Sequence, residues 1–177
     1  MVSKNTLKLL FLVSVVALFA ALTATALSDR PNVELSEQRK SVIPSFTSIS
    51  LLSEKEVNQT VFKSEGYKLL NTWASWCGIC KSEHDELLLL AEQGVPIIGL
   101  NYRDQKQAAR EYLSFKRNPY KEVISDPNGK LAVELGVIGT PETYLIDQNG
   151  IVLIKYRGEL TKDKWNDIFS EYFDVSI

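Results

Sequence analysis

Cys77 and Cys80 are the residues of this sequence best suited to chemistry, because two cysteines separated by two residues can interconvert between a dithiol and a disulfide. A strand is expected over residues 67–73 and a helix from residue 77, so Cys77 falls at a helix N-terminus. Unpaired N–H groups and the helix dipole stabilise a thiolate there. Lowering a thiol pKa from about 8.5 to about 7 raises the ionised fraction at neutral pH from about 3% to about half. We predict that Cys77 attacks disulfides and that Cys80, one turn further in and more buried, is the resolving thiol.

Two other uses of the cysteine pair are open. A structural bridge would close a loop of about four residues and contribute about 2 kcal/mol, which is little for the only two cysteines of the chain. A metal site could add His84, four residues beyond Cys80, but no fourth ligand is evident. The helical pattern accounts for His84 as a packed side chain. Disulfide exchange is therefore the use that we favour.

A second motif, GVIGTPET at residues 136–143, precedes a predicted strand. The Thr140-Pro141 step suggests a tight turn with a cis peptide bond, which would offer its backbone to a partner strand at the active site. A turn with a trans proline is the alternative, and spacing alone does not decide between the two.

The elements that must position these residues alternate between strands and helices, which is typical of an α/β fold. Strands are expected at residues 67–73 and 95–101, and helices at residues 77–93 and 105–117. The apolar stripe of the first helix consists of Cys80, Leu87, Leu88 and Ala91, and Gly94 ends the helix. Asn-Gly between residues 143–147 and 151–156 predicts a β-hairpin, and Thr161 caps a last helix.

The composition is that of one globular domain and not of a disordered or nucleic-acid-binding chain. The 177 residues are 45% hydrophobic and 24% charged, and the formal net charge is only -2. Binding to nucleic acid by electrostatics would need a much stronger positive charge. Two cysteines are too few for the several disulfides that stabilise a small secreted scaffold. With a single histidine, the chain has few ligands for a zinc site.

Residues 9–27 form an uncharged run of 19 residues, preceded by Lys4 and Lys8. As a helix of about 1.5 Å per residue it would be about 28 Å long, close to the ~30 Å hydrocarbon core of a bilayer. We predict one transmembrane signal-anchor with residues 1–8 in the cytoplasm, because the lysines favour the inner side. A cleaved signal peptide is the alternative, since residues 24–26 (ATA) fit a cleavage site. Both alternatives export the rest of the chain, in which residues 28–42 are expected to be a linker and residues 43–177 the folded domain.

WASWCGICKSEH at residues 73–84, followed by GVIGTPETYLID at residues 136–147, resembles the thioredoxin-like CcmG/DsbE family of cytochrome c maturation. The resemblance runs from about Ile43 to Trp165. Its more specific signs are the proline motif, the segment NYRD at residues 101–104 and the segment NPY at residues 118–120. It implies a mixed β-sheet flanked by helices, with a central insert. The resemblance also implies export to the periplasmic side of the inner membrane.

The family resemblance implies site residues beyond the cysteines. Pro141 would be cis and would border the cysteine pair together with Thr140. Acidic residues at Glu83, Glu142 and Glu159 would line a groove. The dipeptide Gly78-Ile79 departs from the Pro-Thr or Pro-Pro that is usual in the family and tunes the redox potential. We expect Trp76 to be half-exposed beside Cys77, and Tyr120 to pack the insert.

The position of Glu83 has a physical reading of its own. It lies three residues after Cys80, on the adjacent helical turn, where we expect it to be half buried. A nearby carboxylate raises a thiol pKa and destabilises the thiolate, so the reduced protein becomes a stronger electron donor. We therefore expect a reductant. A solvated helix residue is the alternative for Glu83, and an ordinary charge at a strand start is the alternative for Glu142.

The resemblance suggests that the protein reduces disulfides between the haem-attachment cysteines of apocytochrome c. Its expected partners are apocytochrome c, the haem-ligation machinery and a membrane electron donor of the DsbD or CcdA type, and no dissociable cofactor is required. A non-catalytic holdase that grips apocytochrome around Pro141 is one alternative. A general exported oxidant is another.

Overall fold

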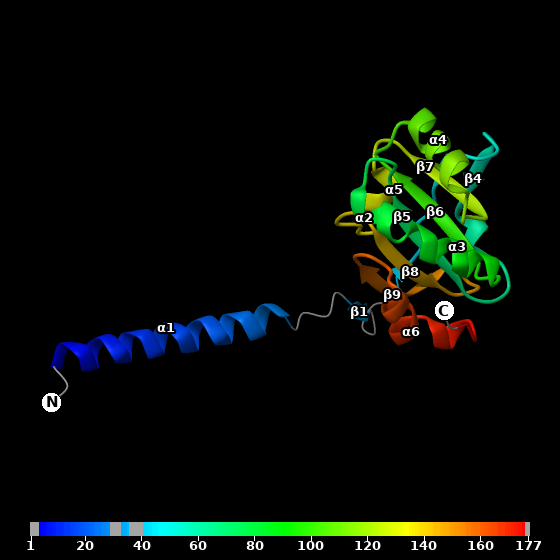
Figure 1. Cartoon of the computed structure of the whole chain (residues 1–177). Coiled ribbons are helices and arrows are strands. Elements are labelled where there is room, and N and C mark those ends of the chain that lie inside the picture. The colour runs from blue at the N-terminus through cyan, green and yellow to red at the C-terminus, as the bar shows by residue number, and fades with distance from the viewer. Residues whose placement is uncertain (1–3, 29–32, 36–40, 176–177) are drawn as a thin grey trace. The chain divides into compact units, whose positions relative to one another are not determined.

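The computed structural model describes residues 4–28, 33–35 and 41–175, which fall into two compact units, Met1–Asn32 and Val33–Ile177 (Figure 1). In the first unit, helix α1 (Lys4–Ser28) contains the predicted span of residues 9–27. No helix among the described residues combines the length and the apolar character needed to cross a bilayer. The signal-anchor stays a prediction. Most of the expected linker, residues 29–32 and 36–40, lies outside the described residues.

The second unit is built on one mixed sheet. Its described strands are β1 (Val33–Leu35), β2 (Ser41–Val42), β3 (Thr47–Ser50), β4 (Glu56–Asn58), β5 (Lys68–Trp73), β6 (Ile97–Tyr102), β7 (Glu122–Asp126), β8 (Glu142–Ile146) and β9 (Ile151–Arg157). Their order across the sheet is β1-β9-β8-β5-β6-β7-β3-β4, with β2 also paired to β9. Strands β5, β6 and β7 run parallel, and β8 and β9 form the predicted antiparallel hairpin. The mixed sheet expected from the sequence is confirmed.

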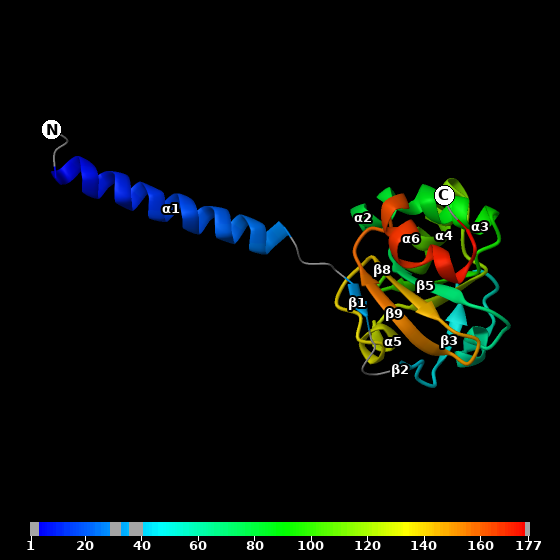
Figure 2. The same ribbon diagram turned by 90° about the horizontal axis from the view of Figure 1, so that it is seen from below.

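Helices cover both faces of this sheet. They are η1 (Gln59–Phe62), α2 (Gly78–Ser82), α3 (His84–Glu92), α4 (Lys106–Lys116), α5 (Lys130–Glu134), α6 (Lys162–Ile168) and η2 (Ser170–Tyr172). Figure 2 shows α2, α3, α4 and α6 on one face and α5 on the other. One apolar cluster lies under the first group, and a second lies under α5 and η1. Every residue of β5 is buried, as expected for a central strand covered on both faces.

The helix predicted over residues 77–93 is divided at Glu83 into α2 and α3. Leu88 and Ala91 of the predicted stripe are only half-buried, whereas Leu90 is fully buried. The buried face of this segment includes Glu83 and His84, because both polar side chains have hydrogen-bond partners inside the domain. Gly94, with φ of 91°, ends the helix as predicted.

The ends of the domain differ from the sequence expectation. Two short strands of the expected linker, β1 and β2, pair with β9, so the sheet begins at Val33 and not at residue 43. Strands β3, β4 and β7 were not predicted, because each is short and lacks a continuous apolar run. Between β6 and β8 the chain contains α4, β7 and α5, and the central insert expected there stays a prediction.

Candidate active site

The cysteine pair lies where β5 leaves the sheet and α2 begins. Cys77 is the N-cap of α2, and its Sγ accepts a hydrogen bond from the backbone N–H of Cys80 at 3.1 Å. The two sulfurs form a disulfide, with the Cα atoms 5.3 Å apart. The predicted helix start is confirmed. The expected difference in burial is wrong for this oxidised form, since Cys77 is 6% exposed and Cys80 5%.

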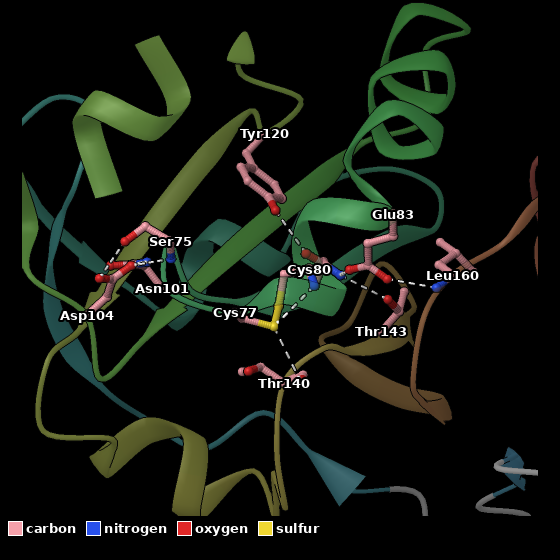
Figure 3. The surroundings of a disulfide bond; sticks show 11 residues. Ser75, Cys77, Cys80, Glu83, Asn101, Asp104, Tyr120, Thr140, Thr143 and Leu160 are labelled. Atoms are coloured by element: carbon pink, nitrogen blue, oxygen red, sulfur yellow. Dashed lines mark hydrogen bonds between the residues drawn. A yellow bond between two sulfur atoms is a disulfide. The ribbon is translucent and has the colours of Figure 1, made fainter. Parts of the chain in front are cut away.

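The loop before β8 lies against Cys77. The Thr140-Pro141 peptide bond is cis, as the family resemblance implied. It brings the carbonyl oxygen of Thr140 to 3.7 Å from Cys77 Sγ (Figure 3). A thiol at Cys77 could donate to this oxygen, whereas the disulfide sulfur has no hydrogen to donate. Thr140 and Pro141 thus border the cysteine pair.

An aspartate that the sequence analysis did not single out holds the turn before Cys77. Asp104 accepts hydrogen bonds from the backbone N–H of Ser75 at 2.6 Å and from the Ser75 hydroxyl at 2.9 Å. It also accepts one from the amide of Asn101 at 2.9 Å (Figure 3). The indole of Trp76 donates to the carbonyl oxygen of Arg103 at 3.1 Å. The loop after β6 therefore fixes the turn that carries the cysteine. The NYRD segment had been noted in the sequence, but its role became clear only from the contact between Asp104, after β6, and Ser75, after β5.

Glu83 is fully buried and not half buried as expected. Its Oε1 accepts a hydrogen bond from Asn71 Nδ2 at 2.8 Å, and its Oε2 accepts one from the backbone N–H of Leu160 at 2.7 Å. Loss of hydration raises the pKa of Glu83 to about 7, although these two donors oppose the shift. The negative charge of the half-buried Glu159 raises it further. Near neutral pH both the protonated and the ionised form of this carboxyl are therefore populated.

Polar residues on the neighbouring strands complete the surroundings of Glu83. Asn71 and Thr143 are directly opposite each other on β5 and β8, and Asn71 Nδ2 lies 3.1 Å from the hydroxyl oxygen of Thr143. The hydroxyl of Tyr120 donates to Asn71 Oδ1 at 2.9 Å. No role was predicted for Asn71 or Thr143. Asn71 is a polar residue inside the apolar run of β5, and its expected burial could have indicated that it has hydrogen-bond partners there.

Glu142 does not line a groove with Glu83, so this expectation is wrong. Alternation along β8 places Glu142 on the face of Tyr144, whereas Thr143 points to Glu83 on the other face. Glu142 is 1% exposed. Its Oε1 accepts hydrogen bonds from the backbone N–H groups of Ile138 at 2.8 Å and Gly139 at 3.0 Å. Its role is to hold the loop that leads to the cis peptide bond.

Three exposed apolar side chains belong to the segments that carry the cysteines and Thr140. Trp76, Ile79 and Ile138 are exposed, and Ile138 is the most exposed of the three at 77%. Such side chains beside a reactive disulfide can take up the apolar residues of a protein substrate. His84 is a packed side chain, as expected, with its ring edge-on to Tyr112 at 5.1 Å between ring centres. Across the residues that the structure describes, no group of three His, Cys, Asp or Glu side chains is placed to hold a metal.

Known proteins resemble this chain in both sequence and fold. Residues 38–171 match the family described as Redoxin. The thiol:disulfide interchange protein DsbE of Pasteurella multocida is 37% identical over 159 residues, which are 90% of this chain and 88% of the relative. DsbE of Escherichia coli K12 is 36% identical over 160 residues, 90% of this chain and 86% of the relative. Among solved structures, a secreted thiol-disulfide isomerase of Corynebacterium glutamicum has a TM-score of 0.69 at 24% identity, covering 83% of this chain and 95% of its own.

Proposed function

Because this chain belongs to the redoxin family, among the thiol:disulfide interchange proteins named DsbE, we propose that it reduces the disulfide between the haem-attachment cysteines of apocytochrome c. Thiol:disulfide oxidoreductase activity follows from the family. The direction of electron flow and the substrate are our proposal. The observation that supports them best is the buried carboxyl of Glu83, one turn after Cys80.

The buried carboxyl favours a reductant on electrostatic grounds. When Glu83 is ionised, its charge acts through the protein interior, where screening by water is weak. A thiolate on Cys80, one helical turn away, is then disfavoured. From further along the chain the same charge opposes the stabilisation that the start of α2 gives to a Cys77 thiolate. Proteins whose thiolates are strongly stabilised are oxidants, so a weaker stabilisation makes the dithiol the better electron donor.

The reaction would proceed through two successive thiol–disulfide exchange steps. The Cys77 thiolate attacks one sulfur of the substrate disulfide, forms a mixed disulfide, and expels the first substrate sulfur, which takes up a proton. The Cys80 thiol then loses its proton and attacks Cys77 Sγ, which re-forms the Cys77–Cys80 bond and frees the second substrate thiol. Two electrons pass from the protein to the substrate, and the two substrate sulfurs leave as thiolates that take up protons from the solvent. With a pKa of about 7, Glu83 is suited to receive the Cys80 proton.

The exposed surface offers a place for an extended substrate chain. The backbone carbonyl of Thr140, 3.7 Å from Cys77 Sγ, can accept a hydrogen bond from a peptide laid across the disulfide. Trp76, Ile79 and Ile138 supply apolar contact on either side of it. Haem ligation requires the two cysteines of a C-x-x-C-H segment as free thiols. A reductant that accepts such a segment in its oxidised form would serve that need.

We also propose that the domain acts on the periplasmic side of the inner membrane, next to the haem-ligation machinery. The uncharged run of residues 9–27, with Lys4 and Lys8 before it, supports this proposal. Tethering would raise the effective concentration of the domain near that machinery. A membrane electron donor of the DsbD or CcdA type would return the Cys77–Cys80 bond to the dithiol. Fractionation of cells that express the full chain tests the location, and recovery in the cytoplasmic fraction would contradict it.

A trapping experiment tests the proposed reaction. The Cys80→Ser variant should accumulate a mixed disulfide between Cys77 and an oxidised C-x-x-C-H peptide, because the resolving thiol is missing, whereas Cys77→Ser should not. In cells, Cys77→Ser should block haem attachment, and an added thiol reductant should restore it. Normal haem attachment in that strain without added reductant would support the non-catalytic holdase instead. Equilibration with glutathione at a potential near that of strong oxidants would support the general oxidant.

A further inference from the structure

Tyr120 follows α4 in the segment between β6 and β8, and its hydroxyl reaches the polar residues around Glu83. Its ring stacks on Trp73, with 5.4 Å between ring centres and 19° between the planes, and is 5% exposed. A Cβ at Gly99 would lie 3.0 Å from the Tyr120 ring and 2.8 Å from Trp73 Nε1, so a glycine is required at this close approach. The ring is therefore fixed on two sides by packing.

The backbone of Tyr120 is fixed as well. The side-chain oxygen of Asn118 accepts a hydrogen bond from the Tyr120 N–H at 3.0 Å. The Asn118 amide donates to the Tyr120 carbonyl oxygen at 2.9 Å. These two bonds close the NPY turn on itself. With ring and backbone both held, the hydroxyl has one position, 2.9 Å from Asn71 Oδ1.

The hydroxyl of Tyr120 stabilises one orientation of the Asn71 side chain. The ionised carboxylate of Glu83 can only accept, so it requires the NH2 group of Asn71 on its side, and the Tyr120 hydroxyl donates to the amide oxygen on the other side. The NH2 group donates to Glu83 Oε1 at 2.8 Å and lies 3.1 Å from Thr143 Oγ1. The opposite orientation would bring the amide oxygen against the Glu83 carboxylate, with no donor between them. Figure 3 shows the Tyr120 hydroxyl and the Glu83 carboxyl within one hydrogen-bonded group.

We propose that Tyr120 is a positioning residue of the redox centre, whose hydroxyl orients the Asn71 amide so that it donates to Glu83. The inference rests on the proposed role of Glu83 in the function described above. It adds a residue from the segment between β6 and β8, 40 positions after Cys80 in the sequence, to the control of the cysteine pair. Without the hydroxyl, Asn71 Oδ1 is a buried acceptor that has lost this donor, and only the contacts of the NH2 group with Glu83 and Thr143 still hold the amide.

Other charged and titratable groups around Glu83 set the background for any pH dependence. Glu86 of α3 and Glu159 of the loop after β9 raise the pKa of Glu83 through their negative charges. Burial raises the pKa values of Tyr112, Tyr120 and Tyr156, and the negative charge of Glu83 raises them further, together with that of Asp85 for Tyr112. These tyrosines are neutral near pH 7, so removing a tyrosine hydroxyl leaves the net charge there unchanged. An effect of Tyr120→Phe would then come from hydrogen bonding.

The test is the pH profile of the rate at which Cys80 of the full chain resolves the mixed disulfide between Cys77 and a C-x-x-C-H peptide, because Cys77 does not titrate in that species and Glu83 would accept the Cys80 proton in that step. Glu83→Gln should remove an inflection near pH 7. Tyr120→Phe should keep the inflection and move it upward by about half a pH unit, which is about a threefold lower ratio of ionised to protonated Glu83. Tyr112→Phe is the matched control. Tyr112 also packs against Trp73, at 5.8 Å between ring centres, but its buried hydroxyl makes no hydrogen bond. This variant should leave the inflection in place.

The outcomes separate the two claims. If Glu83→Gln leaves the inflection unchanged, the proposed role of Glu83 is wrong. If Glu83→Gln removes it and Tyr120→Phe does not move it, the role of Glu83 stands and the inference about Tyr120 is overturned. An equal shift in Tyr112→Phe would also overturn it. Should Tyr120→Phe not fold, NMR of the unmodified protein still tests the inference, because the buried Tyr120 hydroxyl proton must be observed in a hydrogen bond to Asn71, and a hydroxyl without that bond would overturn it.

Discussion

Replacing Glu83 with glutamine should remove a pH-dependent part of the stability of the oxidised protein. Burial raises the pKa of Glu83 from 4.5 to about 7. Between these two pH values the folded state keeps a proton that the unfolded chain has lost, so the free energy of unfolding falls as the pH rises. A shift of about 2.5 units corresponds to about 3 kcal/mol. This contribution is complete below the unfolded pKa and is lost once the pH has passed the folded pKa.

Glutamine cannot ionise, so its stability curve lacks this slope. It also has a single side-chain oxygen, whereas Glu83 accepts hydrogen bonds at both oxygens, from Asn71 and from Leu160. The amide nitrogen of glutamine must therefore face one of these donors, at a cost of about 1–3 kcal/mol at every pH. The stability of the wild type relative to Glu83→Gln should thus fall by about 3 kcal/mol between pH about 4 and about 8.

Urea unfolding of the oxidised full chain across this pH range measures the difference, and the disulfide keeps the cysteines from titrating. Asp85→Asn is the control, because Asp85 is exposed on the same helix. If the difference between wild type and Glu83→Gln stays constant to within about 0.5 kcal/mol over the range, the buried carboxyl does not hold a proton near neutrality. The argument for Glu83 as a proton acceptor would then fail with it.

Three further outcomes are expected. Glu83→Gln should make the cysteine couple more oxidising and lower the Cys77 pKa, as measured by equilibration with glutathione and by alkylation rate; no change in either would contradict the reductant proposal. Asp104→Asn should destabilise the fold by about 1–3 kcal/mol in urea unfolding, because asparagine has one side-chain oxygen and Ser75 donates to both oxygens of Asp104. An unchanged urea midpoint would show that other contacts hold the turn. Glu142→Gln should slow exchange with a disulfide peptide through a looser loop before Thr140, and an unaltered rate would remove the proposed role of this carboxyl.

Much of the fold and the reactive pair could be read from local patterns. The strand before Cys77, the helix that starts at it, the hairpin around Asn149-Gly150 and the cap at Thr161 depend on residues close together in the chain. The cis peptide bond before Pro141 came from the family resemblance, because spacing left both isomers open. Short strands such as β3 were missed, since their burial is decided by a neighbouring strand and not by their own composition.

The acidic residues show where local reasoning stops. Glu83 and Glu142 were expected in one groove, but the sheet separates them, because consecutive residues of β8 point to opposite faces. Likewise, nothing within the NYRD or NPY segments says that Asp104 would reach Ser75 or that Tyr120 would reach Asn71. These contacts join residues 29 and 49 positions apart.

The sequence by itself determined the chemistry, because a helix-capping cysteine and its partner three residues later need only one turn of chain to meet. The tertiary structure decided the electrostatic environment of that chemistry. Glu83 has a raised pKa chiefly because other elements exclude water from it, and the Asn71 amide is held between Glu83 and the hydroxyl of Tyr120, 49 positions further along the chain. Burial and hydrogen bonding between strands are properties of the assembled sheet, so they do not appear in the order of residues along the chain.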